Sequence, residues 1–488
     1  MEYPSFIGGS YQTQAVPADA ELTYNWYVER MESPGATTRL ALYPTPGVSE
    51  IAEAVNGPGR AHFFMDGREF AVIGDKFIEV GEFGSLTTRG TVALDANPAT
   101  ISSNGDGGGQ LFITSGGNGY CFDLATNVLT QIAALNGIAT MGGQIDGYFI
   151  ALDSAASKMY RSALQNGLSW STGTDFSQRS TAPDPWIAMA VNGQYIWLFG
   201  EQTSEVWYDD ASSNVFARHP SGLINYGIAA PFAWAVANGT LVWLGATKIG
   251  DGYVLRANGF TPEVISTYPL QYAINGYPRI DDAVAEAYND FGHTFFMLTF
   301  PSQDVTHVWD AETLLWADRG TWIAPENKFV AWRPRWGVMA FGEHRTLDAE
   351  TGAVYRFNYA SGALDVDDRP IRRLRRAPAL MQENRLVKYM GFEVLLDAGL
   401  GTPTGQGADP QMMMRFSNDG GRTWSNERMR SAGKTGEYGK RVRWERCGTG
   451  RQRVFEISTS DPIPWRVLGA QLTPDPTVAG RRVAQKAA

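Results

Sequence analysis

The feature that most constrains the fold is an irregular repeat that begins near residue 56. Each unit joins an Asn-Gly or Asp-Gly turn, an apolar strand, a polar loop and a second apolar strand, which usually holds an aromatic residue near its middle. Clear turns are Asp66–Gly67, Asp146–Gly147, Asn192–Gly193 and Asn238–Gly239. The second strands are marked by Phe77, Cys121, Tyr160, Trp207, Val254, Val308 and Tyr355, at intervals of 44, 39, 47, 47, 54 and 47 residues.

A period in this range, built from strands and two-residue hairpin turns, is typical of a β-propeller with one four-stranded sheet per blade. Seven markers predict six or seven blades in an all-β chain. The high content of glycine (54 residues) and proline (25 residues) suits many short strands joined by tight turns. The alternative is a pair of β-sandwiches with evenly spaced hairpins. The pattern at residues 280–288 predicts one short helix.

The charge of the chain is divided unevenly. The net charge is −10, but residues 369–488 hold 22 of the 41 Lys and Arg residues and only 11 of the 51 Asp and Glu residues. The C-terminal part therefore carries about +11 and the rest about −21. Such a division indicates two surfaces with different partners, of which nucleic acid is one candidate, or a basic domain that docks on an acidic one.

Other sequence signals concern the cellular setting. No apolar run is long enough to cross a membrane, so we expect no membrane insertion. The first five residues lack the regions of a secretory signal, and we expect assembly in a reducing cytosol. Cys121 and Cys447 are far apart in the sequence and are expected to be buried, reduced thiols.

The sequence names no catalytic centre. The five histidines show no metal-ligand spacing, and we expect no catalytic residues, no metal and no cofactor. The strongest local motif is Ser417–Trp424, in which Asp419 can accept hydrogen bonds from nearby backbone N–H groups while Gly420 and Gly421 permit positive φ. This motif matches the Asp-box of sialidases, but it occurs once and outside the repeats. We interpret it as a structural turn that includes Trp424.

Arginines cluster at the start of the C-terminal part. Four of them stand at Arg372, Arg373, Arg375 and Arg376, and two more, Arg441 and Arg443, alternate with apolar residues in a predicted strand. Closely spaced guanidinium groups suit contact with DNA phosphates, or assembly with another subunit. The alternative is a solvated cluster that pairs with the acidic body.

The C-terminal segment resembles the tail-hub, or nozzle, proteins of short-tailed bacteriophages, also called packaged-DNA stabilisation proteins. The resemblance rests on the turn at residues 417–424, on Tyr438-Gly-Lys-Arg-Val-Arg-Trp-Glu-Arg446 and on Val454-Phe-Glu-Ile457 with Ser460-Asp-Pro462. The segment Tyr24–Val28 and its Pro-Thr-Pro-Gly stop at residues 44–47 are similar to the opening of that family. The middle of the chain agrees only in architecture.

This resemblance implies a domain order. Residues 1–55 would pack with the C-terminal domain, residues 56–362 would form the propeller, residues 363–474 a basic β-sandwich-like platform, and residues 475–488 a flexible basic tail.

The resemblance also implies a function. Family members form a closed ring, generally a hexamer, in the phage tail below the head-to-tail adaptor or connector. They extend the DNA channel, retain the packaged genome and dock tail fibres or spikes and the tail needle. This implies non-specific contact with genomic double-stranded DNA. The alternative function is a tail propeller that binds or cleaves host-surface carbohydrate, with Trp186, Trp207, Trp234 and Trp322 as the candidate aromatic residues for glycan binding.

Overall fold

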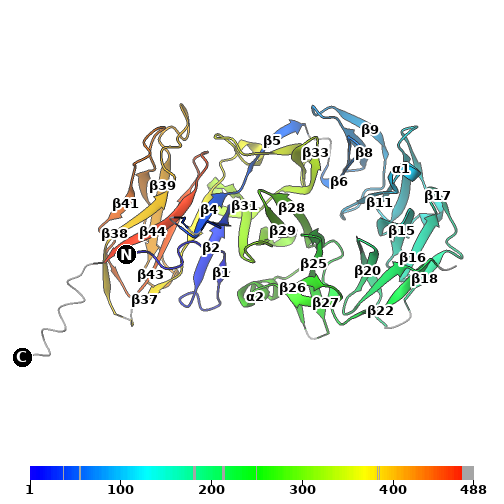
Figure 1. Cartoon of the computed structure of the whole chain (residues 1–488), viewed down its shortest axis with the longest axis horizontal. Coiled ribbons are helices and arrows are strands. Elements are labelled where there is room, and N and C mark those ends of the chain that lie inside the picture. The colour runs from blue at the N-terminus through cyan, green and yellow to red at the C-terminus, as the bar shows by residue number, and fades with distance from the viewer. Residues whose placement is uncertain are drawn as a thin grey trace, which may run out of the picture.

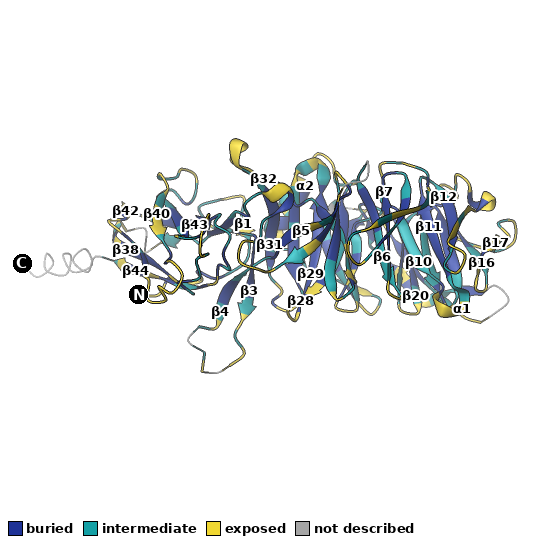
Figure 2. Ribbon diagram, turned by 90° about the horizontal axis from the view of Figure 1, so that it is seen from above, coloured by how far each residue is buried: buried dark blue, intermediate teal, exposed yellow. Residues whose placement is uncertain are grey.

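The computed structural model describes residues 1–474 except 34, 37, 54–56, 180–182, 212–214, 249, 382 and 384. The chain forms a ring of β-sheets with a β-sandwich at one side of the ring, and the N-terminus lies against the sandwich (Figure 1). Buried residues run through the strands of both domains, and exposed residues gather in the connecting loops (Figure 2). The predicted tail, residues 475–488, lies outside the described residues.

The ring is a β-propeller, and its described strands form seven blades. Blade one contains β6 (Gly59–Met65), β7 (Arg68–Ile73), β8 (Lys76–Val80) and β9 (Leu86–Thr91). Blade two contains β10 (Thr100–Ser103), β11 (Gln110–Ser115), β12 (Asn118–Asp123) and β13 (Val128–Gln131). Blade three contains β14 (Met141–Ile145), β15 (Tyr148–Asp153), β16 (Lys158–Ala163) and β17 (Asn166–Trp170), with β18 (Phe176–Gln178) added to β16. Blade four contains β19 (Trp186–Asn192), β20 (Tyr195–Gly200), β21 (Ser204–Asp209) and β22 (Phe216–Ile224).

Blades five to seven follow the same order from the axis outward. Blade five contains β23 (Gly227–Ile228), β24 (Trp234–Ala237), β25 (Thr240–Thr247), β26 (Gly250–Asn258) and β27 (Thr261–Val264). Blade six contains β28 (Val284–Asp290), β29 (His293–Phe300), β30 (Val305–Asp310) and β31 (Trp316–Ile323), with β32 (Lys328–Ala331) added to β31. Blade seven contains β33 (Pro334–Ala340), β34 (Glu343–Asp348), β35 (Val354–Asn358) and β5 (Gly47–Ala52). First strands of neighbouring blades lie side by side: β6 contacts β10 and β33, and β28 contacts β24 and β33. These strands therefore surround the axis.

The repeat predicted from the sequence is confirmed. Each of the seven marker residues lies on the third strand of its blade: β8, β12, β16, β21, β26, β30 and β35. In three of the predicted turns both residues have positive φ: 47° and 71° at Asp66–Gly67, 49° and 83° at Asp146–Gly147, and 51° and 71° at Asn238–Gly239. This is the backbone that a two-residue hairpin requires.

Blade seven is closed by an N-terminal strand. Strand β5 pairs antiparallel with β35, with Val48 opposite Phe357 and Ser49 opposite Arg356. The outermost strand of the last blade thus comes from residues 47–52, which the sequence analysis assigned to the N-terminal segment. The two ends of the propeller sequence are held together by the hydrogen bonds of one sheet.

The second domain is a sandwich of two sheets, and both sheets combine N- and C-terminal strands, as predicted. One sheet runs β2 (Ala20–Tyr24), β36 (Arg373–Arg376), β43 (Gln452–Thr459), β39 (Gln411–Ser417) and β40 (Arg428–Ser431), with β1 (Tyr11–Gln12) on β2 and β37 (Leu380–Met381) on β43. The other runs β3 (Trp26–Arg30), β4 (Leu40–Pro44), β44 (Val467–Pro474), β38 (Val387–Leu396) and β41 (Val442–Glu445), with β42 (Thr449–Gly450) on β38.

The core of the sandwich is aromatic. Trp26, Phe392, Trp444 and Phe455 come from both sheets and are all at most 1% exposed. The first sheet also continues into the propeller, because β2 pairs in parallel with β31 of blade six. Cys447 lies in this core, and both it and Cys121 are buried free thiols, as predicted.

The helix predicted at residues 280–288 is wrong. Val284–Asp290 is the strand β28, which pairs with β29 along its whole length. The short alternating run Ala-Val-Ala-Glu-Ala is compatible with either period, and the neighbouring strand decides between them. The described α-helices are α1 (Gly105–Gly108) and α2 (Tyr268–Asn275).

Candidate functional site

The predicted arginine cluster lies on β36, which has a hydrogen-bonded strand on each side. Arg375 is fully buried and donates hydrogen bonds to the backbone oxygens of Phe6 and Gly9 (both 2.7 Å), and it is ion-paired with Glu21. Arg373 is 5% exposed. Arg375 therefore faces the interior, and an outward role in binding DNA or a neighbouring subunit, expected from the sequence, does not fit its position.

The other members of the cluster are nearer the surface, and both have partners in the same chain. Arg372 donates to Glu427 (2.9 Å), and its guanidinium lies 4.4 Å from the ring centre of Trp322. Arg376 donates to Glu456 (2.8 Å). The cluster joins the N-terminal segment to the sandwich, because Arg375 alone contacts five N-terminal residues: Ser5, Phe6, Gly9, Glu21 and Thr23.

The turn at residues 417–424 is built around Asp419. Its carboxylate accepts hydrogen bonds from Ser417 Oγ (2.6 Å), the Thr423 hydroxyl (2.6 Å) and the backbone N–H groups of Arg422 and Thr423. Burial opposes ionisation, but the hydrogen bonds from Ser417 and Thr423 outweigh it and hold the pKa of Asp419 well below its usual range. Gly420 and Gly421 have φ of 73° and 105°.

Trp424 completes this turn. The guanidinium groups of Arg376 and Arg415 each lie 4.8 Å from its ring centre, and both arginines are ion-paired with the buried Glu456. Every one of these contacts holds the loop to the sandwich.

A group of exposed positive charges of the sandwich lies on what we call the basic edge: Arg430, Lys434, Lys440, Arg441 and Arg446, on or beside the edge strands β40 and β41. Within residues 428–446, seven basic side chains accompany two acidic ones. These strands contact each other and are farthest from the propeller in the order of their sheets. Arg441 forms a two-pronged ion pair with Glu393 (2.7 and 2.6 Å), while Arg443 Nε is 3.9 Å from Glu445.

Most of the basic edge was not singled out by the sequence analysis. The available signal is the spacing of glycines at 433, 436 and 439, which marks turns whose side chains stay in solvent. In contrast, Arg373 and Arg375 flank Leu374 in the strand β36, and alternation places them on the face opposite Leu374 without indicating which face is buried.

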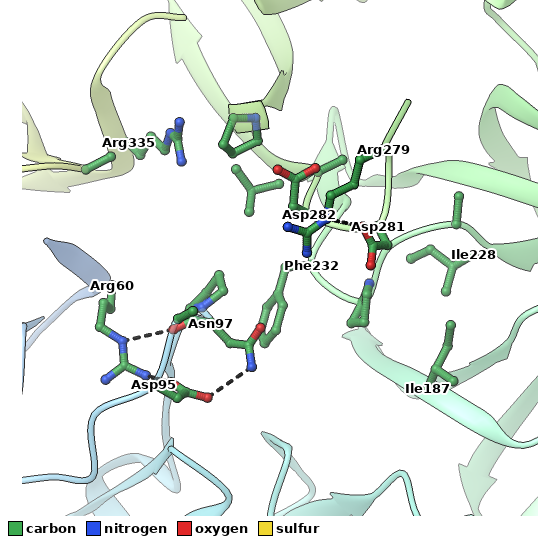
Figure 3. A pocket seen from close by; sticks show the side chains of 18 of the residues that line it. Arg60, Asp95, Asn97, Ile187, Ile228, Phe232, Arg279, Asp281, Asp282 and Arg335 are labelled. Atoms are coloured by element: carbon green, nitrogen blue, oxygen red, sulfur yellow. Dashed lines mark hydrogen bonds and ion pairs between the residues drawn. The ribbon is translucent and has the colours of Figure 1, made fainter. Parts of the chain in front are cut away.

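A cavity of about 930 Å³ lies on the propeller axis, at the end where the first strands begin (Figure 3). Two of its arginines are matched: Arg60 with Asp95, and Arg279 with Asp281 (2.5 Å). Arg335 forms no ion pair among the described residues, and burial lowers its pKa although the charge of Glu286 opposes this. Burial also raises the pKa of Glu286 to about 6.

The described residues contain no group of three His, Cys, Asp or Glu side chains arranged to hold a metal ion. In the part of the chain covered by the structure, no helix is long and apolar enough to span a membrane. Of the tryptophans considered for glycan binding, Trp186 is fully buried, Trp207 packs edge-on against it at 5.8 Å, Trp322 lies beneath Arg372, and Trp234 is half-buried.

These features define a two-domain, all-β protein in which a seven-bladed propeller carries a basic sandwich completed by N-terminal strands. The family model described as "Bacteriophage P22 Gp10, beta-propeller" matches residues 19–362, and that described as "Bacteriophage P22 Gp10, beta-sandwich" matches residues 372–474. The chain belongs to the bacteriophage P22 Gp10 family, a family of phage stabilisation proteins. The family resemblance seen in the sequence is thereby confirmed.

A comparison with curated proteins finds no match. Among solved structures, the computationally designed Ika8 protein is 9% identical, with 63% of this chain and 99% of that chain covered and a TM-score of 0.40. PorZ of the type-IX secretion system of Porphyromonas gingivalis is 10% identical, with 70% and 44% covered and a TM-score of 0.38. The extracellular domain of BT4673 from B. thetaiotaomicron is 10% identical, with 72% and 52% covered and a TM-score of 0.34.

Proposed function

We propose that this protein is a structural component of a short-tailed phage virion, where identical copies form a closed ring that serves as the tail nozzle. The ring, a hexamer by the family resemblance, lies below the head-to-tail connector, extends the DNA channel, retains the genome and docks tail fibres or spikes and the needle. The observation that carries the proposal is the match of both family domains over residues 19–362 and 372–474. The chain acts without catalysis.

The distribution of charge supports a ring. Identical chains close a ring through a heterologous interface, in which one face of a subunit meets a different face of the next. The basic edge and the acidic body, about −21 over residues 1–368, form such a pair of complementary surfaces on one chain. We assign the basic edge to the contact with the neighbouring subunit, the connector or the DNA, and the acidic propeller to the channel wall or the outside. An acidic wall keeps DNA from adhering during ejection, because each neutralised phosphate adds affinity.

The first experiment measures the mass of the purified chain by light scattering, alone and with DNA-filled heads that lack tails. A ring-sized species, or a monomer that assembles only on heads, supports the nozzle. A monomer that ignores heads overturns it.

A charge-reversed variant then tests the basic edge. Arg430→Glu, Lys434→Glu and Arg446→Glu together change exposed side chains only, and we expect them to abolish assembly. The matched control carries the same change in charge on the propeller, at Lys248, Lys328 and Arg356, and should assemble normally. Rings formed by the first variant would show that the basic edge has no part in assembly.

A further inference from the structure

A second pocket lies where the sandwich meets the propeller, and we call it the junction pocket. It has a volume of about 280 Å³ and is lined from the sandwich side by Tyr27, Tyr43 and the loop at residues 462–464, and from the propeller side by Phe291 and Tyr359. It shares no lining residue with the axial cavity and none with the basic edge.

The walls of the junction pocket are mostly apolar and partly exposed. The ring centres of Phe291 and Tyr359 lie 5.1 Å apart, and these side chains are 71% and 45% exposed. Tyr359 is fixed by a hydrogen bond from its hydroxyl to Asp290 (3.0 Å). Prolines line the rest of the pocket, at Pro44, Pro46, Pro462 and Pro464. A surface of rigid rings and prolines changes little in shape when a ligand binds, which lowers the entropic cost of binding.

Arg373 lies in the lining of this pocket and is 5% exposed. Its Nη2 donates to the Thr45 backbone oxygen (3.2 Å), whereas its Nε is buried and has no hydrogen-bond partner. Among the described residues no carboxylate lies at ion-pair distance from it. Burial, together with the like charge of Arg319, lowers the pKa of Arg373 to about 10.

The other charged groups of the lining are already matched. Glu29 is paired with His293 (3.2 Å), and Arg466 with Asp397 (3.1 Å). Asp365, the carboxylate whose charge favours ionised Arg373, accepts a hydrogen bond from Trp332 Nε1 (3.2 Å). Burying a guanidinium is costly unless its charge is paired or its N–H groups are hydrogen-bonded, and Arg373 meets this requirement only in part.

We propose that the junction pocket binds an extended segment of a partner protein, which presents one Asp or Glu carboxylate to Arg373 and an apolar side chain to Phe291 and Tyr359. Arg373 belongs to the lining and has no carboxylate partner among the described residues, so a carboxylate held in the pocket would supply the missing opposite charge. The volume is just below the roughly 300–1,000 Å³ of pockets that hold drug-sized ligands, and it suits one or two side chains of a peptide whose backbone stays outside. This inference concerns the isolated chain and does not depend on ring formation.

The test uses the capped peptide acetyl-Phe-Glu-Pro-Leu-amide and its neutral isostere with Gln in place of Glu, titrated into the full chain by calorimetry. We expect the Glu peptide to bind at least about tenfold more tightly, since a hydrogen bond to a charged group is worth about 1.5–3 kcal/mol. Equal affinity of the two peptides, or no binding at millimolar peptide, overturns the proposal. Acetate that binds as tightly as the Glu peptide shows a simple anion site and also overturns it.

Two variants locate the binding. Arg373→Met should abolish the preference for the Glu peptide, and its circular dichroism and unfolding temperature are measured first. Phe291→Ala removes an exposed ring and should weaken both peptides equally. Unchanged binding by Phe291→Ala contradicts the proposed site even where Arg373→Met does not fold. Light scattering of the same samples reports ring formation separately, so a failure to bind the peptides can be told apart from a failure to form the ring.

Discussion

His293 of blade six and Glu29 of the sandwich lie with Nε2 and Oε2 3.2 Å apart, so a titratable pair joins the two domains. The other ring nitrogen of His293 contacts Asp310 (2.8 Å). Burial alone would lower the pKa of His293, but the hydrogen bonds and charges of Asp310 and Glu29 outweigh it and raise the pKa above 6.5.

A raised pKa fixes the sign of the pH dependence. The folded protein binds the proton of His293 more tightly than the unfolded chain does, so its stabilisation is complete below pH 6.5 and is lost as the pH rises through the folded pKa. We expect the His293→Gln variant to lose less stability than the wild type between about pH 6 and about pH 9, measured by calorimetric unfolding. His219→Gln, which changes a histidine without a carboxylate partner among the described residues, is the control. Parallel pH curves for wild type and His293→Gln would contradict this assignment.

The contribution of Glu286, on the propeller axis, to stability changes with pH in the same direction as that of His293, but for a different reason. Burial raises its pKa from 4.5 to about 6, and the hydrogen bond from the Gly337 N–H (2.8 Å) and the charge of Arg335 only partly oppose this. The contribution is complete below pH 4.5 and is lost as the pH rises through about 6. It amounts to at most about 2 kcal/mol, less in practice because the side chain is only half-buried.

We therefore expect Glu286→Gln, which keeps the acceptor for Gly337, to remove this decline in urea unfolding between about pH 4.5 and about pH 7. The exposed Glu312→Gln serves as the control. A decline that persists in Glu286→Gln would mean that another group causes it.

Arg375 should be the most costly of the predicted arginines to replace. Its removal leaves Glu21 half-buried without its cation and frees the backbone oxygens of Phe6 and Gly9. We expect Arg375→Met to cost about 3–5 kcal/mol in urea unfolding, as found when one partner of a buried ion pair is removed. Limited proteolysis should then cut within residues 1–24. Arg430→Met, at an exposed position, should change the free energy of unfolding by less than about 0.5 kcal/mol.

The sequence predicted the propeller well because each blade carries its own local signals. The backbone conformation of turns such as Asp66–Gly67 is set by the two turn residues themselves, without distant residues. Repeat markers such as Cys121 and Tyr160 lie on the third strands of their blades. The arginine cluster is different. Whether Arg375 faces solvent depends on residues 5–24, which lie some 350 positions earlier in the sequence and cover β36 only in the folded chain. No local pattern contains that information.

The turn at residues 417–424 offers a test of close packing. A Cβ added to Gly420 would lie 2.4 Å from Pro17 Cα, and the residue has a φ of 73°. Gly436 has a comparable φ of 87° but no atom within 4 Å of such a Cβ. Both Gly→Ala variants share the cost of positive φ, about 1 kcal/mol. We expect Gly420→Ala to lose a further 1–3 kcal/mol or so from overpacking. Equal unfolding temperatures for the two variants would show that the N-terminal loop shifts without cost.

Closure of the propeller by β5 can be tested with a pair of proline variants. The Val48 N–H donates to the Leu364 oxygen (2.8 Å), on the side of β5 away from β35. Because backbone groups alternate along a strand, the Ser49 N–H faces β35 and the Glu50 N–H faces away. Proline removes a hydrogen bond to β35 at position 49 but not at position 50.

We therefore expect Ser49→Pro to lower the unfolding temperature and to open blade seven to protease, while Glu50→Pro changes both much less. Hydrogen exchange at β35 is the direct measurement, since the amides that pair with β5 become exposed when the strand detaches. If the amides of β35 exchange equally slowly in both variants, blade seven is stable without its N-terminal strand. Faster exchange in Ser49→Pro alone would show that the strand β5, residues 47–52, holds the last blade in the ring.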